Sequence, residues 1–227
     1  MPHAISNFSV PLSELVQPKS IDRRTSTDTF RSLCFKAGVF EGKRGSAYVE
    51  FGNTKVLSQV HGPREYADGD YHSCSVKVAI KGYTDEKIRA QIQSAMSGCI
   101  QLNKYAKSEI EIEVSVITAE QGVLQAALVS SCLALVHSGI ELWDVVVAAH
   151  VAITESGDFI LDPSVMPENC MGSVTVGVMP QRDQMVCTDI RGALTSRLVN
   201  EVIRYAANKA NSLHSLVKTT LAASLET

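Results

Sequence analysis

Residues 45–65 read GSAYVEFGNTKVLSQVHGPRE, and this stretch decides the fold. Residues 46–51 contain a valine and two aromatic side chains, and residues 55–60 contain two valines, which are residue types that favour strands. Gly52-Asn53-Thr54 stands between them, and a short connection with Gly and Asn is typical of a tight turn. The stretch therefore predicts a β-hairpin.

The segments on either side of the hairpin also have the period of regular structure. Residues 32–39 are mostly apolar, and residues 74–80 alternate between apolar and polar side chains, so both are predicted strands. Residues 85–102 carry apolar side chains at helical spacing and predict a helix. Residues 109–117 alternate between apolar and acidic residues, which indicates a strand with one solvated, acidic face.

The second half of the chain repeats this loose order of helix and strands. Residues 122–137 predict a second, buried helix. Further predicted elements are strands at 145–153 and 159–161, a hairpin of 174–178 with 184–187, and a long helix from Thr195 toward Leu221. Strand clusters followed by helices indicate a mixed α+β domain and not a regular βαβ repeat.

Length and composition favour one globular domain. The chain has 227 residues, of which 45% are apolar and 20% are charged. Residues 1–30 contain three prolines and many Ser and Thr, so we expect an N-terminal arm there and the domain at residues 31–227. No apolar run reaches the roughly 20 residues of a membrane helix, and residues 1–10 do not resemble a signal peptide. We expect no membrane contact.

The net charge of −3 argues against a protein that coats nucleic acid by itself. Residues 19–44 are different, because they contain seven basic and three acidic residues. This segment is either a solvated face or a local patch that contacts phosphate or an acidic partner.

The cysteines and histidines do not form a recognisable metal site. The six cysteines are far apart and the six histidines are scattered, whereas zinc ligands usually occur in close pairs. We therefore expect no metal and no cofactor, and we interpret the cysteines as small buried side chains. His150 lies in an apolar segment and is predicted to be a hydrogen-bonded core histidine.

The ordered pattern G-S-A-x-V-E-x-G-x-T-K-V-L-x-x-V-x-G-P-R-E of residues 45–65 resembles the N-terminal hairpin of the ribonuclease PH family. The resemblance continues through residues 85–102 and 114–135 to Ile160-Leu161-Asp162-Pro163, and it covers about residues 30–220. It implies a ribonuclease-PH-like fold with a mixed sheet and packed helices.

Active members of this family cleave RNA with inorganic phosphate. They are similar to one another in a turn with an arginine and hydroxyl groups at the start of the second helix, where the phosphate anion is held. The corresponding turn here contains Gly122, Val123, Leu124 and Gln125, with Leu124 at the position of the arginine. The resemblance therefore implies a phosphate site that has lost its charge and its side-chain donors.

Two further functional positions of the family also differ in this sequence. Active members carry two aspartates six residues apart, and counting from Leu161-Asp162 places these positions at Glu168 and Val174. The arginine of their first long helix falls near Ser94. Glu168 is a carboxylate, but Val174 and Ser94 lack the required charge, so we predict that the chain has no catalytic residues.

A domain with the scaffold of this family but without its chemistry resembles a structural subunit of the eukaryotic RNA exosome. The resemblance implies a heterohexameric ring of ribonuclease-PH-like subunits, OB-fold cap subunits above it, RNA in its channel, and a location in the nucleus, nucleolus and cytoplasm. An active phosphate-dependent 3′-to-5′ exoribonuclease is the alternative. A metabolic enzyme or binding module that shares the fold is a further one.

Two arginines are candidate RNA contacts by this resemblance. Arg64 precedes a loop that faces the central pore in the family, where a guanidinium can contact the phosphate backbone. It can equally anchor a turn through Glu65 or a carbonyl group. Arg31 matches a family arginine before the first strand, and it either contacts RNA or stabilises a neighbouring subunit.

Overall fold

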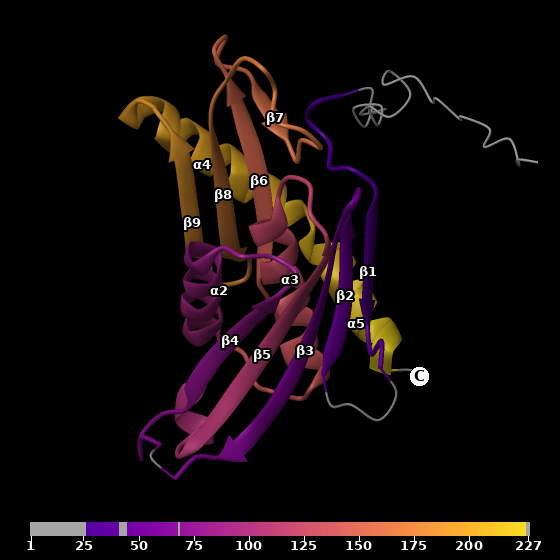
Figure 1. Cartoon of the computed structure of the whole chain (residues 1–227), viewed down its shortest axis with the longest axis vertical. Coiled ribbons are helices and arrows are strands. Elements are labelled where there is room, and N and C mark those ends of the chain that lie inside the picture. The colour runs from indigo at the N-terminus through magenta and orange to yellow at the C-terminus, as the bar shows by residue number, and fades with distance from the viewer. Residues whose placement is uncertain (1–25, 41–44, 68, 226–227) are drawn as a thin grey trace, which may run out of the picture.

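The computed structural model describes residues 26–40, 45–67 and 69–225, which form two β-sheets with a helix between them (Figure 1). The first sheet has the strand order β1-β2-β3-β5-β4 and the second has the order β7-β6-β8-β9. The first sheet contains β1 (Leu33–Ala37), β2 (Ser46–Phe51), β3 (Thr54–Glu65), β4 (Ser75–Lys81) and β5 (Ser108–Thr118). The second contains β6 (Val147–Thr154), β7 (Phe159–Leu161), β8 (Cys170–Met179) and β9 (Gln184–Gly192).

Helix α3 (Val123–His137) is the centre of the core, because it contacts β2 and β3 of the first sheet and β6 and β8 of the second. Its first thirteen residues are all buried, as expected for a helix that is apolar on every side. The other helices are α2 (Glu86–Cys99), the short 3-10 helix η1 (Leu102–Tyr105), α4 (Ser196–Ser212) and α5 (His214–Leu225). Figure 1 shows α4 across β6 and β8 and α5 beside β1.

The α+β prediction and the predicted hairpin are confirmed. Strands β2 and β3 pair in antiparallel register around a turn at Gly52, whose φ of +59° lies in the region that suits glycine. Strand β3 is longer than predicted, because it passes through Gly62-Pro63 and continues to Glu65. A register shift between His61 and Arg64 accommodates this irregular segment, so Arg64 lies on the last residues of β3, directly before the connection to β4.

The predicted C-terminal helix is two helices in the structure. Thr195 caps the first turn of α4 by accepting a hydrogen bond from the Leu198 N–H, and α4 then ends at Ser212. A separate helix, α5, begins at His214 and turns toward α3 and β1. The break allows the C-terminal segment to cover both halves of the core.

Most of the predicted N-terminal arm, residues 1–25, lies outside the described residues. Residues 26–30 lead from the second sheet to the first, where Phe30 packs on Phe51 of β2. The carbonyl oxygen of Thr27 accepts a hydrogen bond from the Leu161 N–H and so extends the edge at β7. Asp28 accepts hydrogen bonds from Tyr205 and Lys209 of α4.

The sheet edges differ in how they are protected. The β4 edge carries Lys77 and Lys81, both paired with glutamates of β5. The β9 edge exposes Met185 and Ile190 instead. In the part of the chain that the structure describes, no helix is both long and apolar enough to cross a membrane.

All six cysteines are free thiols. Cys74, Cys99, Cys132 and Cys187 are buried, as predicted, whereas Cys34 and Cys170 are only half-buried. The interpretation as small core side chains therefore holds for four of the six.

Candidate functional site

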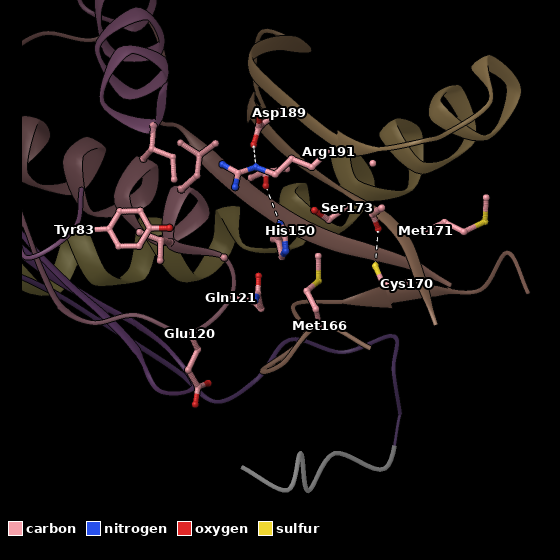
Figure 2. Close-up of a pocket in the computed structure, with 17 residues that line it drawn as sticks. Tyr83, Glu120, Gln121, His150, Met166, Cys170, Met171, Ser173, Asp189 and Arg191 are labelled. Carbon is pink, nitrogen blue, oxygen red and sulfur yellow. Dashed lines mark hydrogen bonds and ion pairs between the residues drawn. The ribbon is translucent and has the colours of Figure 1, made fainter. Parts of the chain in front are cut away.

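A pocket of about 450 Å³ opens at the N-terminus of α3. Its walls are the segments after β4 and β5, the start of α3, Ile88 of α2, Met166, and the strands β6, β8 and β9 (Figure 2). Figure 2 shows Asp189 and Arg191 together on one side of His150, with Met166 and Cys170 on the other. Gly122, Val123 and Leu124 of the predicted turn line this pocket, and the assignment of the turn as a degenerate phosphate site stays a prediction.

The turn that opens α3 brings apolar side chains to the pocket. Gly122 is the N-cap residue with a φ of +75°, and no side chain caps the helix. The backbone N–H groups of a helix start carry partial positive charge, but Val123 and Leu124 beside them are apolar. The helix terminus is therefore present without a charged side-chain donor from this turn.

Gln125 is turned away from the pocket and is fully buried under the turn. Its Nε2 donates to Asp162 Oδ1 at 3.1 Å, and its Oε1 accepts a hydrogen bond from the His150 backbone N–H. These bonds join α3 to the segment after β7 and to β6. Gln125 therefore stabilises the fold, and it does not stand among the residues that line the pocket.

Arg31 lies in a buried network next to the same turn. Its guanidinium binds Asp162 at 2.7 Å and Glu120 at 2.9 Å, and it donates to the Gln121 carbonyl oxygen at 3.1 Å. Asp162 also accepts a hydrogen bond from the Arg31 backbone N–H and adopts a φ of +46°, a strained conformation that Asp tolerates better than most residues. RNA contact by Arg31 stays a prediction, and it would require the guanidinium to leave these carboxylates.

His150 is a buried base on the pocket floor. Its Nδ1 shares a hydrogen bond of 2.8 Å with Thr175 Oγ1, but its Nε2 has no partner among the described residues. Burial lowers the pKa of His150 to about 4, so the ring is neutral at physiological pH. The prediction of a core histidine is confirmed for its burial, but only one ring nitrogen is hydrogen-bonded.

Asp189 and Arg191 of β9 are the charged pair on the pocket wall, and the sequence analysis missed them. Arg191 Nε lies 2.8 Å from Asp189 Oδ2, and Lys87 Nζ lies 2.6 Å from Asp189 Oδ1. Burial alone would raise the pKa of Asp189, but hydrogen bonds from Lys87, Arg191 and Gln91 outweigh it and lower this pKa to about 2. Alternation along β9 puts residues 187, 189 and 191 on one face, which is the signal that could have found them.

The predicted carboxylate positions do not line the pocket. Val174 is fully buried on β8, and its neighbours Ser173 and Thr175 are the side chains that face the pocket. Neighbouring residues of a strand face opposite sides of the sheet, so Val174 faces away from the pocket. The assignment of Glu168 and Val174 to the carboxylate positions stays a prediction. Glu168 is exposed and also lies outside the pocket lining, and Ser94 lies on the exposed side of α2.

Arg64 lies far from this pocket in the fold, at the end of β3. Its guanidinium binds Glu109 at 2.7 Å and Glu111 at 3.0 Å, both on β5, rather than Glu65. Its side chain remains 56% exposed. Glu109 also binds Lys77 and is buried, so the predicted acidic face of β5 is solvated only in part.

The described residues contain no group of three or more His, Cys, Asp or Glu side chains placed to hold a metal ion. The chemical groups that the pocket offers are therefore a neutral imidazole, the Asp189–Arg191 ion pair, the Glu120 carboxylate, the Gln121 amide, the Cys170 thiol, the hydroxyl groups of Tyr83, Ser173 and Thr175, the start of a helix and several apolar side chains.

Residues 29–141 match the 3′ exoribonuclease family, domain 1, of the RNase PH type. An Arabidopsis thaliana protein named exosome complex component RRP41-like is 26% identical in an alignment of 202 positions that covers 83% of this chain and 78% of that protein. The Mus musculus exosome complex component MTR3 is 27% identical in an alignment of 187 positions that covers 68% of this chain and 68% of that protein. Residues 45–48, 62–64 and 140–146 are the runs that resemble the subunit type called mRNA transport regulator three.

The crystal structure of rice (Oryza sativa) Rrp46 has the same fold. Its TM-score is 0.81 at 20% sequence identity, and the match covers 88% of this chain and 98% of the rice protein. The ribonuclease-PH-like fold that the hairpin predicted is thus confirmed.

Proposed function

Because this chain carries an RNase PH domain of the 3′ exoribonuclease family, we propose that it is a structural subunit of an RNA exosome ring without phosphorolytic activity of its own. The names of its relatives in Arabidopsis and mouse, both exosome complex components, support a place in such a complex. In this role the chain completes the channel wall through which RNA passes toward a nuclease elsewhere in the assembly.

The turn at the start of α3 is the observation that carries this proposal. Phosphorolysis brings a phosphate anion against the RNA phosphodiester, so the site must supply positive charge. The charged side chains lining the pocket are Glu120, Asp189 and Arg191, a net charge of −1 with His150 neutral. Leu124 and Val123 add no donor, and Arg191 is already paired with Asp189. Arg31 and Lys87 behind the lining are likewise paired, with Glu120 and Asp189, so none of these cations is free to bind a phosphate ion.

The proposed partners are other ribonuclease-PH-like subunits on both sides in the ring, OB-fold cap subunits, and RNA in the channel. The proposed location is the nucleus with the nucleolus, and the cytoplasm. A permanent ring requires interfaces in the class of 2,000 Å² or more. Arg64 is the proposed contact with the RNA backbone, because its side chain is the half-exposed end of an ion-pair cluster.

An active phosphate-dependent exoribonuclease is the second candidate. It is favoured by the pocket itself, which keeps a volume of about 450 Å³, the start of α3 and a histidine nitrogen without a partner. In this alternative the charged groups that act on the substrate are Asp189 and Arg191, because both line the pocket. Glu168 and Val174 do not line it.

Copurification tests the structural role. Tagged full-length chain is isolated from its own cells, and the stoichiometry of the bound proteins is measured. Ribonuclease-PH-like subunits and OB-fold proteins in near-equal amounts are expected. Recovery of the chain alone would contradict the ring assignment.

A phosphorolysis assay separates the two candidates. The chain alone and the copurified complex are given single-stranded RNA with inorganic phosphate, and nucleoside diphosphates are measured. We expect the chain alone to release no nucleoside diphosphates. The control variant is Asp183→Asn, in an exposed turn, and we expect the complex to release the same amount with Asp189→Asn as with this control. Release that disappears only with Asp189→Asn would establish the enzyme and overturn our proposal.

A further inference from the structure

Three neighbouring strands of the second sheet build a polar floor for the pocket at the start of α3. His150 of β6 pairs with Thr175 of β8, and Thr175 pairs with Asp189 of β9. Ser173 and Arg191 form the next row on the same face, because residues two positions apart on a strand point the same way. All five side chains line the pocket, and Figure 2 shows Ser173 beside His150.

Two polar groups of this floor have no partner in the described part of the chain. Ser173 is 2% exposed, and its hydroxyl group makes no hydrogen bond to another described residue. Nε2 of His150 also has no partner among these residues, although Nδ1 is bonded to Thr175. Buried polar groups are nearly always hydrogen-bonded in folded proteins, so each exception calls for an explanation. A molecule that enters the pocket can supply the missing partner.

Apolar side chains complete the lining of the pocket. They come from α2, from the start of α3 and from the segment that leads into β8, and they are Ile88, Val123, Leu124, Met166 and Met171. Methionine side chains are flexible and adapt to the shape of the molecule that they contact. The volume of about 450 Å³ lies in the range of sites that hold small molecules. The pocket therefore combines an apolar wall with a polar floor, as such sites do.

The charged side chains of the lining are already paired. Glu120 binds Arg31 at 2.9 Å, and Asp189 binds Arg191 at 2.8 Å and Lys87 at 2.6 Å. A charged ligand would have to break one of these ion pairs or stay in the pocket without a counterion, and both are costly. An uncharged ligand avoids both costs.

We propose that the pocket binds an uncharged small molecule that has an apolar body and a hydroxyl group. The body packs against Leu124 and Met166, and the hydroxyl group lies on the floor at Ser173 and His150. A hydroxyl group both donates and accepts, so it can pair with the Ser173 hydroxyl in either orientation and with either tautomer of His150. The inference goes beyond the proposed ring role and does not depend on it, because every group that it uses belongs to this chain.

Titration with 2-naphthol tests the site. This probe is uncharged at neutral pH, carries one hydroxyl group on an apolar ring system, and reports its binding by its own fluorescence. The protein is titrated as it is isolated, in a complex or alone. Naphthalene, which lacks the hydroxyl group, and 2-naphthoate, which carries a negative charge, are titrated in parallel. We expect 2-naphthoate to bind about tenfold more weakly than 2-naphthol, and inorganic phosphate not to displace 2-naphthol.

Ser173→Ala isolates the contribution of the hydroxyl contact. It removes a hydroxyl group without a partner, so we expect no loss in Tm. Binding of 2-naphthol should weaken about fivefold, and binding of naphthalene should not change. Ser131→Ala is the matched control, because Ser131 is also buried with an unpartnered hydroxyl group but does not line the pocket. This control should bind 2-naphthol like the unmodified protein.

Met166→Trp tests the location of the probe. Met166 is half-buried on the segment before β8, so the larger side chain reaches into the pocket from outside both sheets. Binding of 2-naphthol and of naphthalene should both be lost.

Four results would overturn the proposal. No binding of 2-naphthol by the unmodified protein would show that the pocket takes no such ligand, and full binding by Met166→Trp would show that the probe binds elsewhere. Equal affinity of Ser173→Ala and Ser131→Ala would remove the hydroxyl contact. Displacement by inorganic phosphate would show that the pocket takes anions. The copurification experiment decides the ring role separately, so the two proposals fail independently.

Discussion

Arg31 and Arg64 make similar contacts in two regions of the molecule, yet their environments are opposite. Each arginine binds two carboxylates, Asp162 and Glu120 for Arg31 and Glu109 and Glu111 for Arg64. The Arg31 side chain is 5% exposed, whereas that of Arg64 is 56% exposed. The buried network of Arg31 joins segments that are distant along the chain, whereas the network of Arg64 joins the neighbouring strands β3 and β5.

The difference teaches which charges the fold depends on. Removing one partner of a buried ion pair leaves the other charge in a poorly solvated place, which is strongly destabilising. An exposed pair is hydrated and screened, so its loss changes stability little. The buried charges around Arg31 therefore stabilise the fold, whereas the fold depends little on the exposed Arg64.

Arg31→Ala should have the largest effect on stability. It leaves Asp162 buried without its counterion, and we expect a loss of about 3–5 kcal/mol in the free energy of unfolding. Urea denaturation of the full chain measures this. The double variant Arg31→Ala with Asp162→Asn should lose less than the sum of the two single variants, because no buried charge remains unpaired. A loss below about 1 kcal/mol for Arg31→Ala would contradict the comparison.

His150 should make the buried region sensitive to acid. Its pKa is about 4 in the folded chain and 6.5 as its ordinary value, so the unfolded chain binds the extra proton between these pH values. The contribution of neutral His150 to the free energy of unfolding is therefore fully present above pH 6.5. This free energy falls by up to about 3 kcal/mol as pH drops toward 4. His150→Gln should flatten this part of the profile in thermal unfolding.

Asp70→Asn is the control for the pH profile. Hydrogen bonds from the His72 N–H and Ser73 lower the pKa of Asp70 below its ordinary value of 3.8, so its contribution is present above that value and is lost only as pH falls further. Asp70 is not among the charges that act on His150, so its variant should leave the slope between pH 6.5 and 4.5 unchanged. An identical slope in His150→Gln and unmodified protein would show that other groups cause the acid sensitivity.

Arg64→Gln should have the smallest effect on stability. Glu109 keeps Lys77 as its partner, so we expect no resolvable change in Tm. Protection of RNA by the assembled complex should nevertheless decrease. Arg197→Gln on α4 is the matched control, because Arg197 is also an exposed arginine paired with a glutamate. Equal RNA protection by both variants would show that Arg64 does not contact RNA.

The fold followed from local patterns, because each pattern reports directly on burial. The alternation of residues 46–51 indicates a half-buried strand. The apolar composition of residues 122–137 indicates a buried helix. The extension of β3 through Gly62-Pro63 could not be predicted, since an irregular pairing hides the period that strand prediction uses.

The turn of residues 122–125 could be located from the sequence, because a helix start is visible there, and three of its residues line the pocket. Its role as a degenerate phosphate site stays a prediction. Asp189, Arg191 and the Asp162 network depend on contacts between segments that are distant along the chain, and sequence spacing carries no information about these. Val174 lies on β8 and faces away from the pocket, and its assignment to a carboxylate position also stays a prediction.

The exposed edge at β9 has a practical consequence for handling the protein. Its nine residues include exposed Met185 and Ile190 but no lysine or proline, whereas β4 at the other sheet's edge carries two lysines. Natural proteins use such lysines to prevent strands of different molecules from pairing. We therefore expect the chain produced alone to aggregate through β9, and Ile190→Lys to improve its solubility.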